Sequence, residues 1–285
     1  MCENGSHLNR MKTVAIATSI VFDLKNRDKA RPLFKSPSIH LAVERIIAGG
    51  TASPIYVDNI QDPKSAVTWT SNRVYVAGDF EDKDFIEGLN VVMNSQFLRA
   101  YLIGDRFVFY PDNVGWIPVI KQQFWDTKIT EGKRRYYAAE IEDEMTVAVP
   151  NGFQITEVSK ALLLKPLKNI ERLMMEMMSE QETVEAFLDK SFGVAAVTDV
   201  DMAGWCLSEN NTGGRFEVGV ETVEEHRCLG IATALTNTLA KMGREKWFHR
   251  MGWHCWASNE ASNATARRLG FKLVAEYPAV QIDLA

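Results

Sequence analysis

The chain has little cysteine for its length. Its 285 residues include four cysteines, Cys2, Cys206, Cys228 and Cys255, with neither a Cys-x-x-Cys pair nor a Cys-His ligand spacing. Zinc sites and disulfide frameworks depend on such spacings. The sequence therefore predicts no metal site, and it favours a reducing, cytoplasmic compartment.

Long apolar runs and an excess of positive charge are also missing. No run approaches the ~18 apolar residues of a membrane helix. The longest uncharged stretch, residues 13–22, resembles a signal-peptide core less than an opening strand, because Asp23 and further charges follow it. With 32 Lys and Arg against 37 Asp and Glu, the net charge of −5 repels nucleic acid and anionic lipid. We expect no nucleic-acid or membrane partner, and a monomer or a homodimer.

The composition is that of a folded protein of about two domains. Hydrophobic residues make up 46% and charged residues 24% of the chain, which excludes disordered and low-complexity classes. A length of 285 residues suggests about two domains at roughly 150 residues each. Acidic residues at 140–144, followed by the turn signal Pro150-Asn151-Gly152, predict domains at 11–148 and 149–285. Residues before Met11, which include a tag-like Gly5-Ser6-His7, are left out of the functional argument.

Hydrophobic periodicity predicts helices and strands in both halves. Helices are expected at 27–49, 82–98, 116–125, 167–178, 182–188, 227–246 and 259–269. Strands are expected at 54–57, 65–70, 73–77, 106–110, 134–141, 192–198, 202–207, 215–222, 252–257, 271–277 and 280–284. This order predicts an α+β fold with a mixed, mainly antiparallel sheet and flanking helices. Both halves run helix, strands, helix, strand, so a duplicated fold is a hypothesis.

Residues 221–235 form the segment that is richest in chemical information. A strand ends there in a turn of small residues that opens a long helix. The first N–H groups of a helix lack intrahelical acceptors and carry partial positive charge, so they can bind a pyrophosphate. Arg227 adds a full positive charge and Thr233 a hydroxyl. The segment has neither the phosphate-loop nor the dinucleotide-binding glycine pattern, so it predicts another phosphate ligand.

This segment resembles the acyl-CoA loop of the GNAT acetyltransferase superfamily. The family pattern Arg/Gln-x-x-Gly-x-Gly/Ala is matched by Arg227-Cys228-Leu229-Gly230-Ile231-Ala232. A second match follows at the family's distance, with the strand Trp253-His254-Cys255-Trp256, then Asn259, then Leu269-Gly270-Phe271. The resemblance covers about residues 153–284 and implies a C-terminal GNAT fold.

A narrower resemblance is to the zwittermicin-resistance-like branch of this superfamily. It rests on residues 204–209 and 216–222, and on weaker similarity of the N-terminal half, for example at Tyr56-Val57-Asp58-Asn59. That branch carries an N-terminal extension. The resemblance therefore implies an N-terminal α/β domain that is a degenerate GNAT-like domain.

The resemblance implies acetyl-CoA as the acyl-donor cosubstrate and a set of cofactor-binding residues. Pantetheine contacts would come from Val220, Thr222 and Val223, and from Asn259. The pyrophosphate would lie on the loop and first helical turn, formed by Arg227, Cys228, Leu229, Gly230, Ile231, Ala232 and Thr233. Two structural alternatives remain open: Gly230 and Ala232 would permit close helix packing, and Asn259 would cap its helix.

Two departures from the family pattern bear on the mechanism. The family helix carries a tyrosine seven residues after the asparagine, as proton donor to the thiolate, whereas residue 266 here is alanine. Cys228 replaces the first glycine of the loop, so its side chain is expected to point away from the phosphates. A covalent role for this thiol is less favoured than a plain structural one, because no base is apparent beside it.

Direct attack of an amine on the thioester needs a proton acceptor and an oxyanion donor. The resemblance implies a backbone N–H of the strand ending at Thr222 as the oxyanion donor. Glu217 and Glu221 share one face of that strand by period-two alternation and are the candidate catalytic bases, with a solvated strand face as the alternative. His254 is a further candidate, although core packing is favoured for it, and His226 could cover the cofactor.

These features predict an acetyl-CoA-dependent N-acetyltransferase that acts on the amine of a small molecule. The alternative is a CoA-binding sensor or regulatory protein without turnover, suggested by Ala266. A third hypothesis, a detoxifying or self-resistance enzyme whose N-terminal half shapes the acceptor site, rests on the family branch alone.

Overall fold

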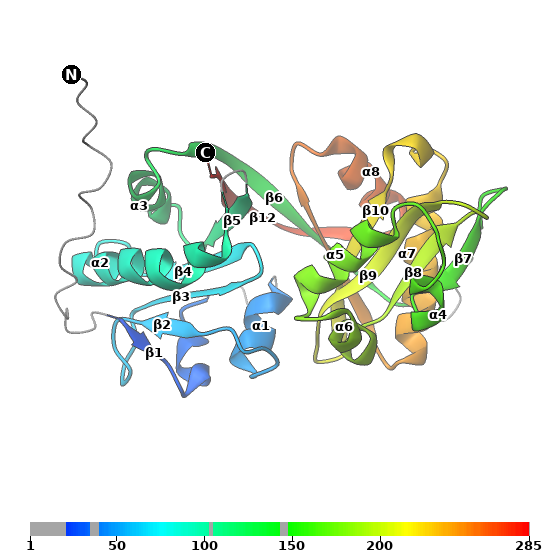
Figure 1. Cartoon of the computed structure of the whole chain (residues 1–285). Helices are drawn as coiled ribbons and strands as arrows, with labels where there is room; N and C mark the ends of the chain where they lie inside the picture. The colour runs from blue at the N-terminus through cyan, green and yellow to red at the C-terminus, as the bar shows by residue number, and fades with distance from the viewer. Residues whose placement is uncertain (1–20, 35–39, 103–104, 143–147, 285) are drawn as a thin grey trace, which may run out of the picture.

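The strands that the structure describes all belong to one sheet. The computed structural model describes residues 21–34, 40–102, 105–142 and 148–284. Twelve strands follow the order β1-β2-β3-β4-β5-β12-β6-β11-β10-β9-β8-β7. Figure 1 shows the first half of the chain on one side and the second half on the other, joined by the long strands β6 and β12. The fold is thus a mixed α+β structure.

Most of the elements lie where the sequence predicts them. The strands are β1 (Phe22–Asp23), β2 (Ile55–Val57), β3 (Ser65–Thr70), β4 (Arg73–Gly78), β5 (Arg106–Pro111), β6 (Lys128–Glu140), β7 (Gln154–Glu157), β8 (Gly193–Val197), β9 (Met202–Thr212), β10 (Arg215–Thr222), β11 (Arg250–Trp256) and β12 (Lys272–Asp283). The α-helices are α1 (Leu41–Ile47), α2 (Lys83–Val92), α3 (Trp116–Gln123), α4 (Lys160–Leu163), α5 (Ile170–Glu180), α6 (Val184–Lys190), α7 (Ile231–Glu245) and α8 (Glu260–Arg268). Short 3-10 or π turns are η1 (Arg27–Ala30), η2 (Met93–Phe97), η3 (Leu98–Ala100) and η4 (Glu224–His226).

Some predicted elements differ in extent from the structure. The single helix expected at 27–49 is instead the turn η1 and the separate helix α1. The break lies between the two: Arg31, before Pro32, keeps helical backbone angles, whereas His40, before α1, has an extended backbone. The strands expected at 271–277 and 280–284 are one strand, β12, in which Pro278 lies before the residues that pair with β5. Its missing N–H therefore removes no bond to β5. Of the opening strand expected within 13–22, only Phe22 falls among the paired described residues.

The two halves of the chain repeat one strand order and exchange their last strands. In each half, four antiparallel strands lead to a parallel pair, β4 with β5 and β10 with β11. The last strand of the first half, β6, then pairs with β11, and the last strand of the second half, β12, pairs with β5. β6 and β12 also pair with each other along their length. Strands that precede residue 148 therefore pair with strands that follow residue 149. The domain boundary between these residues stays a prediction.

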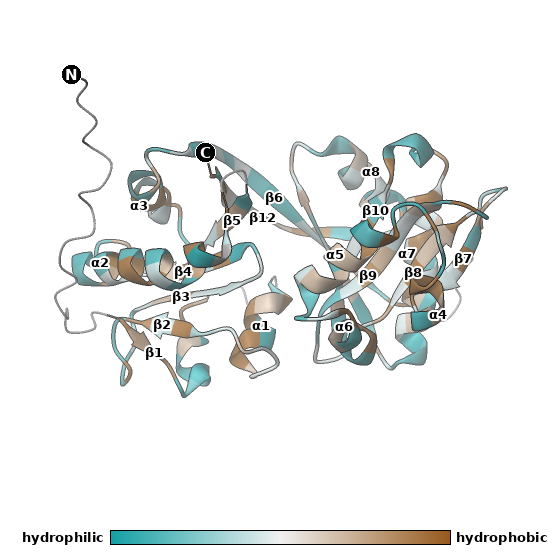
Figure 2. Ribbon diagram, viewed as in Figure 1, coloured by the Kyte–Doolittle hydropathy of each residue, from teal (hydrophilic) through white to brown (hydrophobic). Residues whose placement is uncertain are grey.

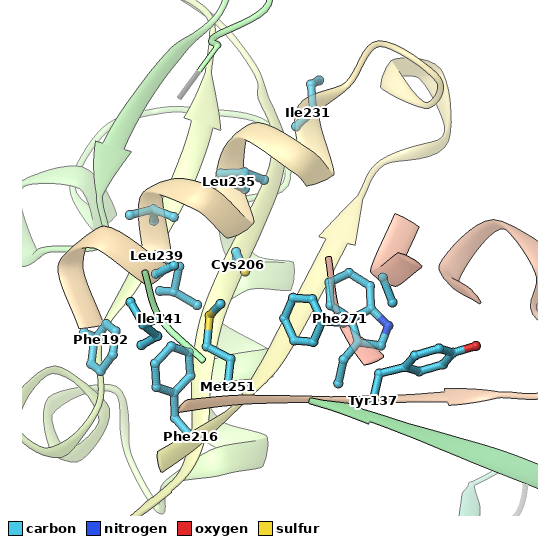
Figure 3. Close-up of a cluster of buried hydrophobic side chains, with 14 of the residues drawn as sticks. Tyr137, Ile141, Phe192, Cys206, Phe216, Ile231, Leu235, Leu239, Met251 and Phe271 are labelled. Carbon is cyan, nitrogen blue, oxygen red and sulfur yellow. The ribbon is translucent and has the colours of Figure 1, made fainter. Parts of the chain in front are cut away.

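Apolar side chains fill both faces of the sheet. Figure 3 shows the cluster under α7, where Leu235 and Leu239 lie beside Cys206 and Met251 of the sheet. A second cluster lies under α2 and α3, a third under α1, and a fourth under α5 and α6. Figure 2 shows that β6, between the halves, is hydrophilic along much of its length. Among the described residues, no helix is both long enough and apolar enough to span a membrane.

The exchange of β6 and β12 predicts which fragments of the chain unfold cooperatively. A fragment of residues 149–285 lacks β6 and leaves β11 and β12 without their common neighbour. We expect this fragment to give no cooperative thermal transition by circular dichroism, whereas a fragment of residues 128–285, which keeps β6, gives one. Cooperative unfolding of the shorter fragment would contradict the shared-strand architecture and support an independent domain from residue 149.

Candidate active site

The central feature of the second half is the separation of two parallel strands. β10 and β11 pair only at Arg215–Arg250, Phe216–Met251 and Glu217–Gly252. Beyond these pairs β10 continues beside β9, and β11 continues beside β6. The sheet therefore opens between the C-terminal ends of β10 and β11, and the backbone along this opening is free to bind an extended ligand.

Strand alternation decides which residues face the opening. The Val223 N–H donates to the Ala203 carbonyl at 3.0 Å, so odd-numbered residues at the end of β10 direct their polar backbone toward β9. Val218, Val220 and Thr222 therefore direct theirs toward the opening. Thr222 also has a buried hydroxyl oxygen without a hydrogen-bond partner among the described residues. Of the three residues at the end of β10 that are predicted to contact pantetheine, Val220 and Thr222 face the opening, whereas the N–H of Val223 donates to the Ala203 carbonyl.

The loop before α7 presents its backbone to solvent. Gly230 precedes the helix with φ +85° and no side-chain cap. Arg227, Cys228, Leu229 and Gly230 are exposed. The first N–H groups of α7, at Ile231, Ala232 and Thr233, have no intrahelical acceptor. Arg227 Nε donates to the Thr222 carbonyl at 3.3 Å, which holds its charge beside the end of β10.

Cys228 adopts a backbone conformation that favours glycine. Its φ is +63°, in the left-handed region, and its side chain is exposed. A residue with a Cβ is strained there by about 1–2 kcal/mol. Cys228 therefore replaces the family's glycine at a position where the backbone conformation favours glycine.

Helix α8 explains two of the sequence features. Asn259 is the N-cap, and its side chain accepts a hydrogen bond from Ser262 N at 3.0 Å. Its cap role is therefore present, while its contact with pantetheine stays a prediction. Ala266 is fully buried in the cluster under α7. A tyrosine at 266 would have to displace core side chains, so the alanine belongs to the packing of this chain.

A cavity of about 180 Å³ lies at the point where β10 and β11 separate. Both halves of the chain contribute to its walls. The lining residues are His40, Arg73, Tyr75, Tyr110, Arg134, Glu209, Glu217, Val218, Gly219, Val220, Trp253, His254, Ser262 and Tyr277. Val218 and Val220 belong to the open edge of β10, so the cavity adjoins the opening in the sheet.

Glu217, His254 and Tyr277 form a hydrogen-bonded chain along one wall of this cavity. Glu217 Oε1 lies 3.2 Å from His254 Nε2, and His254 Nδ1 lies 2.7 Å from the Tyr277 hydroxyl. The Glu217 carboxylate also accepts from Leu41 N at 3.0 Å and from Asn210 Nδ2 at 2.9 Å. Burial raises the pKa of Glu217, but His254, Arg73 and His40 outweigh it and lower the pKa to about 2. Glu217 is thus a permanent anion that orients His254.

His40 completes this wall from the first half of the chain. Its ring lies 5.5 Å from His254 in a stacked arrangement and 4.7 Å from Tyr277 edge-on. Burial, and then the neighbouring His254, lower the pKa of His40 to about 3. His40 is therefore neutral at physiological pH. It packs against the histidine that Glu217 holds and adds no charge to the cavity.

The cavity is also lined by a partly buried ion pair that depends on a glycine. Arg73 Nη2 lies 3.0 Å from Glu209 Oε2. A Cβ at Gly219 would lie 2.0 Å from Glu209 Oε1, so any side chain there would displace the carboxylate. Gly219 thus leaves room for Glu209 to neutralise Arg73 at the edge of the opening.

The second predicted base, Glu221, lies outside the cavity. It forms an ion pair with Arg172 of α5 and is partly exposed. The two carboxylates share a strand face as predicted, yet only Glu217 lines the cavity. His254, for which core packing was expected, has its ring centroid 4.6 Å from that of Tyr136 and also lines the cavity. His226 pairs instead with Asp201 at 3.0 Å.

The cavity residues that come from the first half and from the shared strands were not predicted from the sequence. These are His40, Arg73, Tyr75, Tyr110, Arg134 and Tyr277. No local motif marks them, because their meeting depends on strand pairings between distant segments. In the described ranges, no group of three or more His, Cys, Asp or Glu side chains is arranged to hold a metal ion.

A family model described as GNAT acetyltransferase matches residues 31–280. The chain belongs to the GNAT acetyltransferase family. The uncharacterised N-acetyltransferase YdfB of Bacillus subtilis is 25% identical over 252 residues, which cover 88% of this chain and 90% of that relative. The match includes most of the N-terminal half, which the sequence motifs had linked to the family only weakly.

Solved structures of GNAT proteins have the same fold over nearly the whole chain. A GCN5-related N-acetyltransferase-like protein from Streptococcus suis superposes with a TM-score of 0.68 at 19% identity, covering 90% of this chain and 98% of its own. A GCN5-related N-acetyltransferase from Sphaerobacter thermophilus gives a TM-score of 0.61 at 12% identity, covering 93% and 96%. At these identities the likeness concerns the fold.

The loop before α7 leads to a pair of predictions of opposite sign. Replacing Cys228 with glycine removes the strain of a positive φ, and we expect it to raise the free energy of unfolding by about 0.5–1 kcal/mol. Gly230→Ala introduces such strain in open space and should lower it by about 1 kcal/mol. Urea unfolding of the variants and the wild type measures both. Changes of the same sign would show that φ does not dominate the stability of this loop.

Proposed function

We propose that this protein is an acetyl-CoA-dependent N-acetyltransferase that acts on the amine of a small molecule. One observation carries the proposal: the opening between β10 and β11 adjoins a cavity in which Glu217, His254 and Tyr277 form a hydrogen-bonded chain. The opening suits a thioester arm, and the cavity suits an acceptor whose proton must be removed.

Acetyl-CoA binds in this proposal along the open edge of β10. The pyrophosphate lies on the N–H groups of the loop and first turn of α7, beside Arg227. The pantetheine arm runs past Thr222 and Val220, whose backbone groups and unpartnered Thr222 hydroxyl supply its hydrogen bonds. The acetyl group then reaches the cavity, where a backbone N–H of β10 stabilises the oxyanion.

The reaction is a direct acyl transfer. The amine nitrogen attacks the thioester carbonyl carbon, an N–C bond forms, the C–S bond breaks and the CoA thiolate leaves. The amine proton passes to the Tyr277 hydroxyl as that hydroxyl gives its own proton to His254 Nδ1, and Glu217 stabilises the imidazolium. A thiol has a pKa of about 8.5, so the thiolate leaves without a tyrosine at residue 266.

The N-terminal half is proposed to be a degenerate GNAT-like domain without a CoA site. Its strand order, which repeats that of the second half, supports this. The helix after its parallel strand, α2, is capped by the Asp82 side chain, which accepts from Asp84 N and Phe85 N. With Asp79, Glu81 and Asp84 nearby in sequence, this helix start is acidic and self-satisfied. It would repel a pyrophosphate, whereas the uncapped start of α7 would attract one.

A CoA-binding sensor without turnover is the second candidate, and the buried Ala266 in place of a proton donor favours it. Both candidates predict that the protein binds acetyl-CoA, but only the enzyme predicts turnover.

Isothermal calorimetry should give a micromolar Kd for acetyl-CoA, and Arg227→Glu should weaken binding at least tenfold by charge reversal at the pyrophosphate. Lys241→Glu, exposed later on α7, is the matched control and should leave the Kd within twofold. Wild-type protein that is folded and binds no acetyl-CoA would overturn both candidates.

Turnover separates the enzyme from the sensor. With an amine acceptor in excess, we expect Glu217→Gln and His254→Gln to lower kcat by about 100-fold or more, because the proton acceptor is lost. Glu221→Gln on the same strand face removes only a partly exposed ion pair and should keep kcat within threefold. Release of free CoA thiol is the readout, with circular dichroism to verify folding. Equal losses in Glu221→Gln and Glu217→Gln would remove the special role of Glu217.

A further inference from the structure

One arginine in the cavity wall is a cation without a counterion. Arg134 lies on β6, and its Nε is buried without a hydrogen-bond partner among the described residues. Its Nη1 donates to the Tyr110 hydroxyl at 3.0 Å, and its guanidinium carbon lies 5.7 Å from the Tyr110 ring and 5.5 Å from the Trp256 ring. No carboxylate in the described ranges forms an ion pair with it.

The other arginines around this part of the fold are paired. Arg73 pairs with Glu209, Arg45 with Glu180, Arg215 with Glu44 and Arg172 with Glu221. An arginine remains charged at any physiological pH. A largely enclosed guanidinium with only aromatic neighbours and one hydroxyl is poorly compensated, and it favours an anion from outside the chain.

The charges that remain in the cavity form a complementary pair. Arg73 and Glu209 neutralise each other, and His40 is neutral because burial and the nearby His254 lower its pKa. This leaves the Glu217 carboxylate, which acts through His254 and Tyr277, and the Arg134 guanidinium. Tyr277 separates them: its hydroxyl bonds His254, and its backbone is opposite Arg134 in the β12–β6 register. A ligand with one positive and one negative group matches this arrangement.

The volume limits the size of that ligand. A protein cavity of about 150 Å³ accommodates benzene. The 180 Å³ cavity therefore accommodates a compact molecule of a few more atoms, such as a small amino acid. A long polyamine would have to extend out of the cavity, and it would bring a second cation to Arg134.

We propose that the acceptor is a small amino acid, or a similar compact amino carboxylate, whose carboxylate binds Arg134 while its amine approaches Tyr277 and the thioester. This rests on the proposed acetyltransferase function and names the acceptor class. The ammonium first loses one proton to water; the amine nitrogen then forms the amide bond as the C–S bond breaks and the CoA thiolate leaves, and a second proton reaches His254 through Tyr277. The product is an N-acetyl amino carboxylate.

The test compares acceptors that differ only in the carboxylate. Wild-type protein with saturating acetyl-CoA is assayed for thiol release with small α-amino acids, with their primary amides and with the decarboxylated amines. We expect kcat/KM to be at least 100-fold higher for the best amino acid than for its amide and its decarboxylated amine, because both analogues leave Arg134 without an anion. Equal rates for the three forms would overturn the proposal while leaving the acetyltransferase intact.

Two variants then locate the carboxylate. Arg134→Met keeps the bulk of the side chain and should lower the preference for carboxylate over amide by at least 30-fold, with an unchanged Kd for acetyl-CoA. Arg135→Met, the neighbour that pairs with Glu276 at 3.1 Å, is the control and should keep the preference. An unchanged preference in a folded Arg134→Met variant would overturn the assignment.

A binding measurement covers the case in which no amine of the panel is acetylated. The N-acetyl derivatives of the same amino acids are titrated into the wild-type protein with CoA bound, and into Arg134→Met. Binding to the wild type that weakens at least tenfold in the variant supports the proposal, and absence of binding to the wild type overturns it. Failure of acetyl-CoA itself to bind is a separate result, which overturns the proposed function.

Discussion

The buried carboxylate of Glu217 is the contact on which the arrangement of the site depends. It accepts hydrogen bonds from the backbone at the start of α1, from Asn210 of β9, and from His254 of β11. These partners come from both halves of the chain and from both strands that flank β10. A buried anion is stable only with such complete hydrogen bonding, so Glu217 couples the position of α1 to the orientation of His254. In the proposed function, proton transfer from the substrate and the packing of the two halves therefore depend on the same carboxylate.

The exchange of the last strands explains why the cavity has walls from both halves. β6 and β12 each extend through both parts of the sheet, and they bring Arg134 and Tyr277 to the place where β10 and β11 separate. If each half kept its own last strand, β12 rather than β6 would adjoin β11. Arg134 would then have no fixed place beside the second half, and Arg73 would have no fixed place near Glu209.

The sequence predicted what is local and left out what is assembled from distant segments. The loop at Arg227–Ala232 could be recognised because it is contiguous, and the alternation that places Glu217 and Glu221 on one face could be read from period two. The sequence could not distinguish the roles of these two carboxylates, because Glu217 contacts His254 of β11 and Glu221 contacts Arg172 of α5. Arg134 and Tyr277 carry no motif, and their roles arise only from the β12–β6 register. The single helix expected at 27–49 was wrong, because His40 has an extended backbone and α1 begins only after it.

The two halves share one strand order but differ at the helix that follows the first strand of each parallel pair. In the first half β4 is followed by α2, which Asp82 caps. In the second half β10 is followed by α7, which begins after Gly230, a residue with a positive φ and no side-chain cap. A capping carboxylate satisfies the first N–H groups and adds negative charge, whereas a left-handed glycine turns the chain without occupying them. The difference is a choice of one or two residues at a helix start. In the proposed function this difference places the phosphate-binding position at α7, beside the open strands, while the first half contributes His40, Tyr75 and Tyr110 to the cavity.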